Sequence, residues 1–152
     1  MEALTVDELR ACCAAPVWGA AILAGRPRDR AAVLAAADAA SRALGWDDVL
    51  TALAAHPRIG ERAAGGSREA AWSRREQEGV SPDDALVAVN VAYEEKFGHV
   101  FLIFASGKGR EEIVAEARRR LGNDPETEKE EVRGELGKIA RLRLERLLDA
   151  RG

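Results

Sequence analysis

The sequence predicts an all-α protein, built as a single-domain bundle of seven or eight helices with one short extended segment near residues 100–104. Two observations lead to this prediction. Helix start and stop signals recur along the chain at spacings that suit ordinary helices. Only the run 100–104, which is aromatic and aliphatic and bounded by glycines, has the composition of a strand, and one strand cannot form a sheet without a partner. The length of 152 residues is that of one domain, so we expect residues 1–152 to form a single helical domain.

Each helix expected in the N-terminal half has its own start signal. Thr5 and Glu8 form a capping box, in which each side chain bonds the backbone N–H of the other residue. Proline is favoured at the first helical position, so Pro16 marks the second helix. Asp29 can cap the third helix, for which Gly45 is the expected stop. The spans expected for the third and fourth helices are 30–44 and 46–55.

Similar signals continue through the C-terminal half. Ser67 can cap a helix that ends at Gly79. Ser81 and Pro82, followed by two aspartates, combine a cap, a first-turn proline and acids at the positive end of a helix that stops at Gly98. The spans expected in this half are 67–79, 82–97, 109–121 and 125–149.

The charge balance argues against a nucleic-acid partner. The chain has 23 basic and 26 acidic residues and a net charge of −3, whereas nucleic-acid binders show a basic excess or a basic stripe. The densest basic run, Arg118 to Arg120, follows Glu111, Glu112 and Glu116 on the same expected helix. We therefore interpret this run as part of a solvated, charged helix face.

Other sequence features bear on compartment and metals. No apolar run approaches the roughly 20 residues of a membrane span, so we expect no membrane partner. The acidic N-terminus lacks signal-peptide character and the C-terminus lacks a peroxisomal tripeptide, which favours the cytoplasm. Adjacent Cys12 and Cys13 suggest neither a disulfide framework nor a zinc site. The histidines, His56 and His99, form no His-x-x-x-His pair, which makes a metal hydrolase a poor fit.

His56 is the first candidate for chemistry. It precedes Pro57, which disfavours helical backbone at His56 and predicts an extended residue just past a helix end. An imidazole titrates near neutral pH and suits acid–base catalysis. The alternative is a helix-end histidine that caps a carbonyl, and the local sequence leaves both interpretations open.

A second candidate is one face of the expected helix 67–79. Arg74 and Arg75 point away from this face. An indole, a hydroxyl, a carboxylate and an amide within an arc of about 140° could bind a small polar heterocycle. The alternative is an ordinary amphipathic helix with a tryptophan as its core anchor. The four residues of the face are Trp72, Ser73, Glu76 and Gln77.

The last helix carries an arginine within its apolar stripe. Arg143 lies in the middle of the stripe on a helical wheel, and Arg141 lies on the opposite side. An arginine on a core face is costly unless it meets an anion. That anion is either a substrate or a structural partner such as Glu94 or Glu76. The stripe consists of Val132, Leu136, Ile139 and Leu147.

A further helical face combines aromatic and polar residues. Asn90, Tyr93, Glu94 and Phe97 share it, at spacings of three or four residues. We interpret this face as core packing with one polar group, and we expect His99 to be structural or solvent-facing.

Four motifs follow one another along nearly the whole chain. They are Ala55-His56-Pro57-Arg58-Ile59-Gly60-Glu61, Ser73-x-x-Glu76-Gln77-x-Gly79, Asn90-x-x-Tyr93-x-x-Lys96-Phe97-Gly98-x-x-Phe101-Leu102-Ile103 and Ile139-x-x-x-Arg143-Leu144. In order and spacing they resemble the OHCU decarboxylase family, the 2-oxo-4-hydroxy-4-carboxy-5-ureidoimidazoline decarboxylases. One departure is Arg58-Ile59-Gly60, where many members read Asp-Leu-Ala.

The resemblance implies a carboxy-lyase that converts this ureidoimidazoline to S-allantoin in urate degradation. Its partner would be the small-molecule substrate, and the oligomeric state, a homodimer included, stays open. The substrate's own ring would accept the electrons left by carbon dioxide, so no cofactor and no metal is expected. The implied catalytic residues are His56, Glu76 and Arg143. The implied substrate-binding residues are Pro57, Ser73, Gln77, Phe101, Leu102 and Ile103.

The alternative is a non-catalytic helical binding or regulatory module, for example a DNA-binding regulator. The acidic charge balance and the lack of a clear basic recognition helix count against it.

Overall fold

The computed structural model describes residues 3–56 and 84–151. Within these residues the chain is helical, with seven α-helices and no strand, as expected for an all-α protein. The expected helix 67–79 and the cap at Ser81 lie outside the described residues. The chain divides into two compact units, of which the first comprises residues 1–55 and 133–152 and the second comprises residues 56–132.

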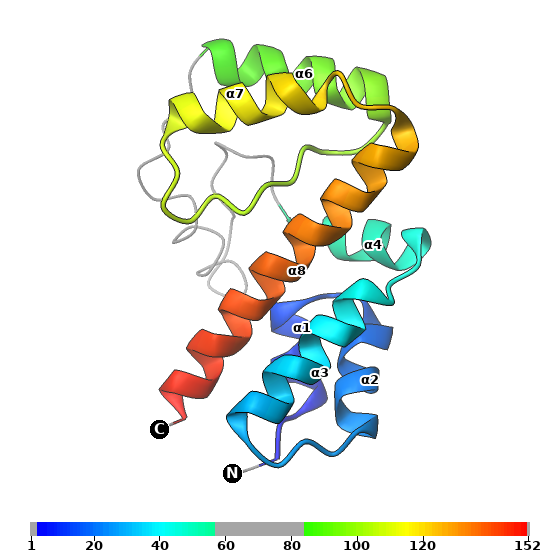
Figure 1. Ribbon diagram of the computed structural model, residues 1–152, viewed down its shortest axis with the longest axis vertical. Coiled ribbons are helices and arrows are strands. Elements are labelled where there is room, and N and C mark those ends of the chain that lie inside the picture. The colour runs from blue at the N-terminus through cyan, green and yellow to red at the C-terminus, as the bar shows by residue number, and fades with distance from the viewer. Residues whose placement is uncertain (1–2, 57–83, 152) are drawn as a thin grey trace. The chain divides into compact units, whose positions relative to one another are not determined.

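The first unit contains four short helices and the C-terminal part of a long one (Figure 1). Helix α2 packs against both α1 and α3. The boundary between the two units falls within the long helix α8, near Arg133. The helices are α1 (Val6–Cys12), α2 (Pro16–Ala24), α3 (Arg30–Arg42), α4 (Trp46–Leu53) and α8 (Pro125–Ala150).

The predicted helix starts of this unit are confirmed. The Thr5 backbone N–H donates to Glu8 Oε1 at 3.0 Å, and the Glu8 N–H donates to Thr5 Oγ1 at 3.1 Å. Pro16 is the first residue of α2. Asp29 Oδ1 accepts the Ala32 N–H at 2.8 Å and so caps α3. Local side-chain capping therefore fixes where these helices begin.

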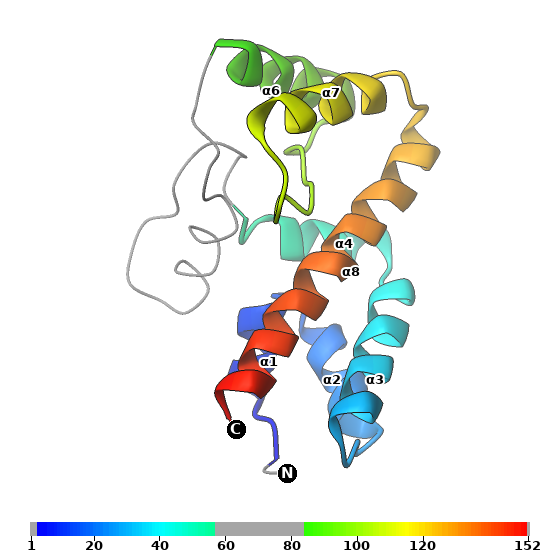
Figure 2. The same ribbon diagram turned by 60° about the vertical axis from the view of Figure 1, so that its left-hand side comes forward.

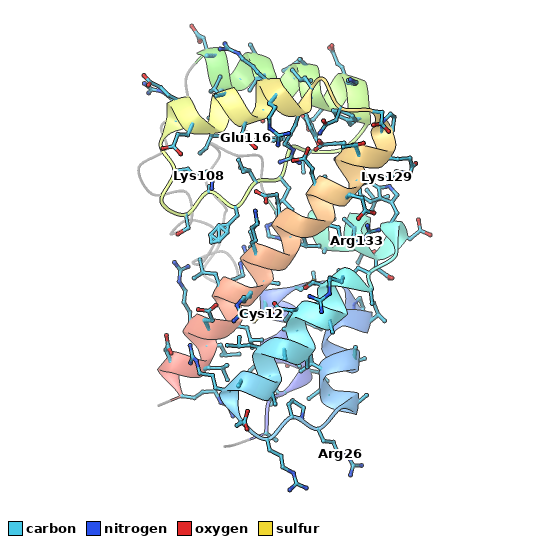
Figure 3. The ribbon with its side chains drawn as sticks, viewed as in Figure 1. Cys12, Arg26, Lys108, Glu116, Lys129 and Arg133 are labelled. Carbon is cyan, nitrogen blue, oxygen red and sulfur yellow. The ribbon has the colours of Figure 1, made fainter. Side chains whose placement is uncertain are left out.

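The predicted ends of α3 and α4 are wrong by two residues. Helix α3 ends at Arg42 rather than 44, and α4 ends at Leu53 rather than 55. Gly45 does not stop α3 but is the N-cap residue of α4, with φ −72° and ψ 163°. Beyond the end of α3, Leu44 is buried and its carbonyl accepts a hydrogen bond from Arg133 Nε at 2.9 Å. Arg133 projects from α8 (Figure 3).

Ser41 on α3 is the point where three helices of the first unit meet. Its Oγ accepts a hydrogen bond from Trp18 Nε1 of α2 at 3.0 Å, and both side chains are buried. On the other side a Cβ added to Gly137 of α8 would lie 3.2 Å from Ser41 Cβ. A glycine at position 137 therefore lets α8 approach α3 closely.

Ion pairs at the surface connect α8 to the rest of the first unit. Arg141 pairs with Asp38 of α3, and Arg30 Nη1 lies 2.7 Å from Asp149 Oδ1. Arg151 Nη1 lies 2.6 Å from Glu8 Oε2, just past the end of α8. Ion pairs with solvent access contribute about 0–1 kcal/mol each, so burial of the apolar stripe contributes more. Every residue of the predicted stripe is at most 5% exposed, namely Val132, Leu136, Ile139 and Leu147.

The second unit contains α6 (Asp84–Phe97), α7 (Arg110–Arg120) and the N-terminal part of α8. Helices α6 and α7 lie side by side, and residues 98–109 return along them to the start of α7 (Figures 1 and 2). Helix α6 ends at Phe97 as predicted, and Gly98 follows with φ +78°, a conformation that favours glycine. The predicted spans of α7 and α8 are confirmed to within one residue at each end.

The segment 100–105 is neither helix nor strand. Phe101, Ile103 and Ala105 are buried in one hydrophobic cluster with residues of α6 and α7, whereas Leu102 is buried outside that cluster. Alternate side chains on one face are the pattern of an extended chain. The short extended segment predicted near residues 100–104 therefore lines the core of the second unit.

Replacing Ser41 should destabilise the first unit without disturbing its shape. Ser41→Ala leaves the buried Trp18 N–H without its acceptor, and the free energy of unfolding should fall by about 1–3 kcal/mol. Urea denaturation followed by tryptophan fluorescence measures this loss. Ser106→Ala, in an exposed turn, is the matched control and should change stability by less than about 0.5 kcal/mol. Equal effects at the two serines would contradict a structural role for the Trp18–Ser41 hydrogen bond.

Candidate active site

The described residues include five of the nine predicted site residues. They are His56, Phe101, Leu102, Ile103 and Arg143. The other four lie outside the described residues, namely Pro57, Ser73, Glu76 and Gln77.

His56 lies outside any helix, three positions after Leu53, the last residue of α4. It is half-buried, so its imidazole is neither sealed in the core nor fully solvated. This position is compatible with acid–base chemistry and with a helix-end cap. The catalytic role of His56 therefore stays a prediction.

Arg143 is buried within the apolar stripe of α8, with 1% of its surface exposed. Arg141, two positions earlier, has a side chain that is 41% exposed and forms ion pairs with Asp38 and Glu145. The helical-wheel placement of the two arginines is thus confirmed. A guanidinium buried at this depth requires an anionic or strongly polar environment, because desolvating an isolated charge is costly.

The segment Phe101–Ile103 contacts Arg120, an arginine that was expected to lie on a solvated helix face. Arg120 Nη1 donates to the Leu102 carbonyl at 2.7 Å. Its guanidinium carbon also lies 4.6 Å from the centroid of the Phe101 ring. Tyr93 packs on the same ring with its edge, at a centroid distance of 5.2 Å. All these side chains are buried.

Arg120 and Glu128 form a fully buried ion pair, with side chains 1% and 0% exposed. Arg120 Nε lies 2.9 Å from Glu128 Oε2, and Nη2 donates to the same oxygen. The Tyr93 hydroxyl also donates to Glu128 Oε2, and Asn123 Nδ2 donates to Oε1 at 3.0 Å. The carboxylate is therefore satisfied on both oxygens, as a buried charge must be.

Burial and the charge of Glu128 shift the pKa values of Tyr93 and Arg120. Burial raises the pKa of Tyr93 well above its usual value, and the hydrogen bond to Glu128 raises it further. Burial alone would lower the pKa of Arg120, but the hydrogen bonds and charge of Glu128 outweigh it and raise that pKa. Arg120 is therefore cationic and Tyr93 neutral at every physiological pH.

The interpretation of Arg118 to Arg120 as a solvated face is wrong for Arg120. Arg118 and Arg119 are exposed, but Arg120 shares the core face of α7 with Ile113 and Ala117. Helical spacing could have predicted the burial of Arg120, since residues 113, 117 and 120 lie on one face of the helix. The burial of Glu128 was also not predicted. Its position carried the same kind of signal, since it lies four residues before Val132 and continues the apolar stripe of α8. Each charge is buried because the other is its partner.

The buried pair continues to the surface through a second set of charges. Asn123 Nδ2 also donates to Glu131 Oε2 at 2.5 Å. Arg119 lies 2.6 Å from Glu131 Oε1 and 2.8 Å from Glu116 Oε1. Glu116 projects from α7 in Figure 3. Asn123 thus connects an exposed charge cluster to the buried carboxylate of Glu128.

His99 is half-buried beside the aromatic side chains of α6, in agreement with the structural role expected for it. Its ring lies 5.5 Å from that of Tyr93 in an edge contact and stacks on Phe97. Among residues 3–56 and 84–151, no group of three His, Cys, Asp or Glu side chains is arranged to hold a metal ion. The described helices include none with the length and apolarity needed to cross a membrane.

The helices and the buried irregular segment place this chain among small all-α proteins. A family model described as OHCU decarboxylase matches residues 2–145. The chain therefore belongs to the OHCU decarboxylase family, as its motifs predicted.

Several known proteins are similar to this chain. The Arabidopsis thaliana uric acid degradation bifunctional protein TTL is 30% identical over 151 residues, covering 93% of this chain and 46% of the plant protein. A mouse 2-oxo-4-hydroxy-4-carboxy-5-ureidoimidazoline decarboxylase is 35% identical over 105 residues, covering 64% of this chain and 59% of the mouse protein. The chain thus spans about half the length of these two relatives.

A solved structure extends the similarity to the fold. It is a crystal structure of an OHCU decarboxylase in the presence of (S)-allantoin, with a TM-score of 0.74 and 26% sequence identity. The match covers 94% of this chain and 98% of that chain, so the helical fold is shared over nearly its full length.

The surface charge cluster predicts an acid-sensitive contribution to stability. The hydrogen bond from Arg119 lowers the pKa of Glu131, and that from Asn123 lowers it further. A depressed carboxyl pKa stabilises the fold above the ordinary pKa of the group and ceases to do so as the pH falls through the folded value. Glu131→Gln should therefore reduce the free energy of unfolding at pH 7 by up to about 1 kcal/mol.

The difference between Glu131→Gln and the wild type should shrink as the pH falls below about 4. Denaturant titrations at pH 7, 5 and 3 measure it. Glu95→Gln, at an exposed position of α6, is the control and should change stability little at any pH. A difference that grows towards low pH would contradict the assigned role of Glu131.

Proposed function

We propose that this chain decarboxylates 2-oxo-4-hydroxy-4-carboxy-5-ureidoimidazoline to S-allantoin in urate degradation. The observation that carries the proposal is membership of the OHCU decarboxylase family over residues 2–145. The similar structure with (S)-allantoin supports the identity of the product. A cytoplasmic location and the absence of nucleic-acid and membrane partners stay predictions.

The proposed reaction needs little beyond positioning and a proton. The bond between the ring carbon and the carboxylate breaks, carbon dioxide leaves, and the bonding electron pair stays on the ring carbon. The adjacent imidazoline delocalises that pair. A proton delivered to one face of the carbon then gives the S product. An apolar wall helps, because the carboxylate loses hydration that carbon dioxide does not need.

Each predicted site residue has a proposed role in this reaction. His56 is the general acid/base, and Pro57 fixes the backbone of His56 and contacts the substrate. Glu76 orients the proton transfer, with Ser73 and Gln77 binding the ring and the ureido group. Arg143 binds an anionic or carbonyl oxygen of the substrate. The buried segment Phe101–Ile103 contributes backbone groups and an apolar wall.

A coupled assay tests the proposed function directly. Urate, urate oxidase and hydroxyisourate hydrolase generate the substrate in the cuvette, and optical activity follows the formation of allantoin. Addition of this protein should accelerate formation of the S enantiomer in proportion to protein concentration. Slow racemic decay at an unchanged rate would refute the proposal.

Replacement of His56 should remove proton transfer while preserving the fold. His56→Asn should lower turnover by about 10²–10⁴-fold, the usual contribution of a general acid or base. The melting temperature should change little. His99→Asn is the matched control, and it should retain near-normal turnover because His99 packs beside Tyr93 and Phe97. If His56→Asn is largely unfolded but its folded fraction turns over normally, His56 is a cap.

Arg143 and Arg141 should differ sharply despite being two positions apart. A planar guanidinium can hold an oxyanion with two parallel hydrogen bonds, which lysine cannot reproduce. Arg143→Lys should therefore lose most turnover, and Arg143→Ala more. Arg141→Ala removes only partly exposed ion pairs and should keep near-normal turnover.

Turnover per folded molecule distinguishes the two interpretations of Arg143. A purely structural ion pair predicts that Arg143→Ala loses about 3–5 kcal/mol of stability while its folded fraction remains active. Turnover and melting temperature are measured for all three variants. A destabilised Arg143→Ala whose folded fraction keeps normal turnover would exclude Arg143 from the site.

A further inference from the structure

Arg120 is the one described side chain outside the predicted site that bonds the backbone of the predicted substrate wall. Its Nη1 donates to the Leu102 carbonyl at 2.7 Å, and its guanidinium lies over the Phe101 ring. With 1% of the side chain exposed, this hydrogen bond does not compete with bulk water. In an irregular segment, side chains can supply the hydrogen bonds that a helix or strand would otherwise provide.

The hydrogen bond from Arg120 to the Leu102 carbonyl determines which backbone groups of the segment remain available to bind a ligand. Phe101 and Ile103 direct their side chains into the same cluster, which is the alternation of an extended chain. In an extended chain successive carbonyls point to opposite sides. When the Leu102 carbonyl faces Arg120, the backbone groups of its two neighbours face the other way.

Arg120 is in turn held rigidly by Glu128. Two nitrogens of the guanidinium bond the carboxylate, and the third bonds Leu102. Tyr93 and Asn123 hold the carboxylate from other directions. No rotamer of Arg120 can change without breaking several buried hydrogen bonds, so the Leu102 carbonyl is fixed relative to α7 and α8.

We propose that Arg120 is a positioning residue, which orients the segment Phe101–Ile103 so that the backbone groups of Phe101 and Ile103 bind the substrate. The inference rests on the proposed decarboxylase function. Arg120 does not touch the substrate, and its effect passes through the Leu102 carbonyl. Glu128 acts one step further away, by holding the guanidinium.

The substitution Arg120→Lys tests this role because it keeps the positive charge but removes the planar guanidinium with its several N–H donors. An ammonium group on a single carbon cannot hold both Glu128 oxygens and the Leu102 carbonyl in their present geometry. Loss of one oriented binding contact corresponds to about tenfold in KM. KM for the coupled-assay substrate should therefore rise about tenfold, while kcat per folded molecule changes by less than about threefold.

A destabilised control separates positioning from general loss of stability. Ile113→Ala opens a cavity in the same hydrophobic cluster but leaves the Arg120–Leu102 hydrogen bond in place. Per folded molecule its KM should stay within about twofold of the wild type. If Ile113→Ala raises KM as much as Arg120→Lys does, the effect is one of core packing and the proposal is overturned.

Tyr93→Phe provides a second variant should Arg120→Lys fail to fold. It keeps the ring beside Phe101 and removes only the hydroxyl that holds Glu128. KM should rise by about three- to fivefold in Tyr93→Phe, and Glu128→Gln should add little to KM in the Arg120→Lys background. An unchanged KM in both Arg120→Lys and Tyr93→Phe overturns the proposal.

Wild-type activity distinguishes failure of this inference from failure of the proposed function. If the wild type forms S-allantoin and the variants keep its KM, only the positioning role is wrong. If the wild type itself forms none, the proposed function is wrong and the positioning role falls with it.

Discussion

The buried ion pair between Arg120 and Glu128 is the interaction on which the second unit depends. It joins the end of α7 to the start of α8 and, through the Leu102 carbonyl, fixes the irregular segment between α6 and α7. Removing one partner of such a pair strands the other charge in the core, at a cost of about 3–5 kcal/mol. Replacing both by apolar residues would be far less costly to stability. The main structural consequence of the pair is therefore that it holds the Leu102 carbonyl in a defined place.

The two most buried arginines of the described residues, Arg120 and Arg143, have different proposed roles. Arg120 is surrounded by fixed protein partners, so its charge is fully committed to the fold. Arg143 lies in the apolar stripe of α8, and its motif is the one that the family resemblance connects to substrate. Under the proposed function, Arg120 is buried to organise a wall and Arg143 is buried to bind a ligand. Depth of burial alone does not separate these roles, whereas turnover measured per folded molecule does.

Part of the candidate site could be predicted from sequence because its signals are periodic. The wheel position of Arg143 and the apolar run around Phe101 both identified buried positions correctly. Arg120 and Glu128 follow the same periodicity, but charged residues are usually solvated, so their burial was not expected. Tyr93 was expected to provide core packing with one polar group, and its hydroxyl does bond Glu128. The sequence could not predict that Tyr93, Arg120 and Glu128 would form hydrogen bonds with one another in the core.

The sequence by itself determined where the helices begin, because caps act within a single turn and need no distant partner. Thr5, Asp29 and Pro16 each set a start through local hydrogen bonding or a fixed backbone angle. Only the tertiary structure decided the partner of the Leu44 carbonyl beyond the end of α3, since that partner is Arg133, far away in the chain. It also decided which charges are buried. Desolvation makes a lone buried charge unfavourable, so its burial depends on a partner that only the folded chain brings within reach.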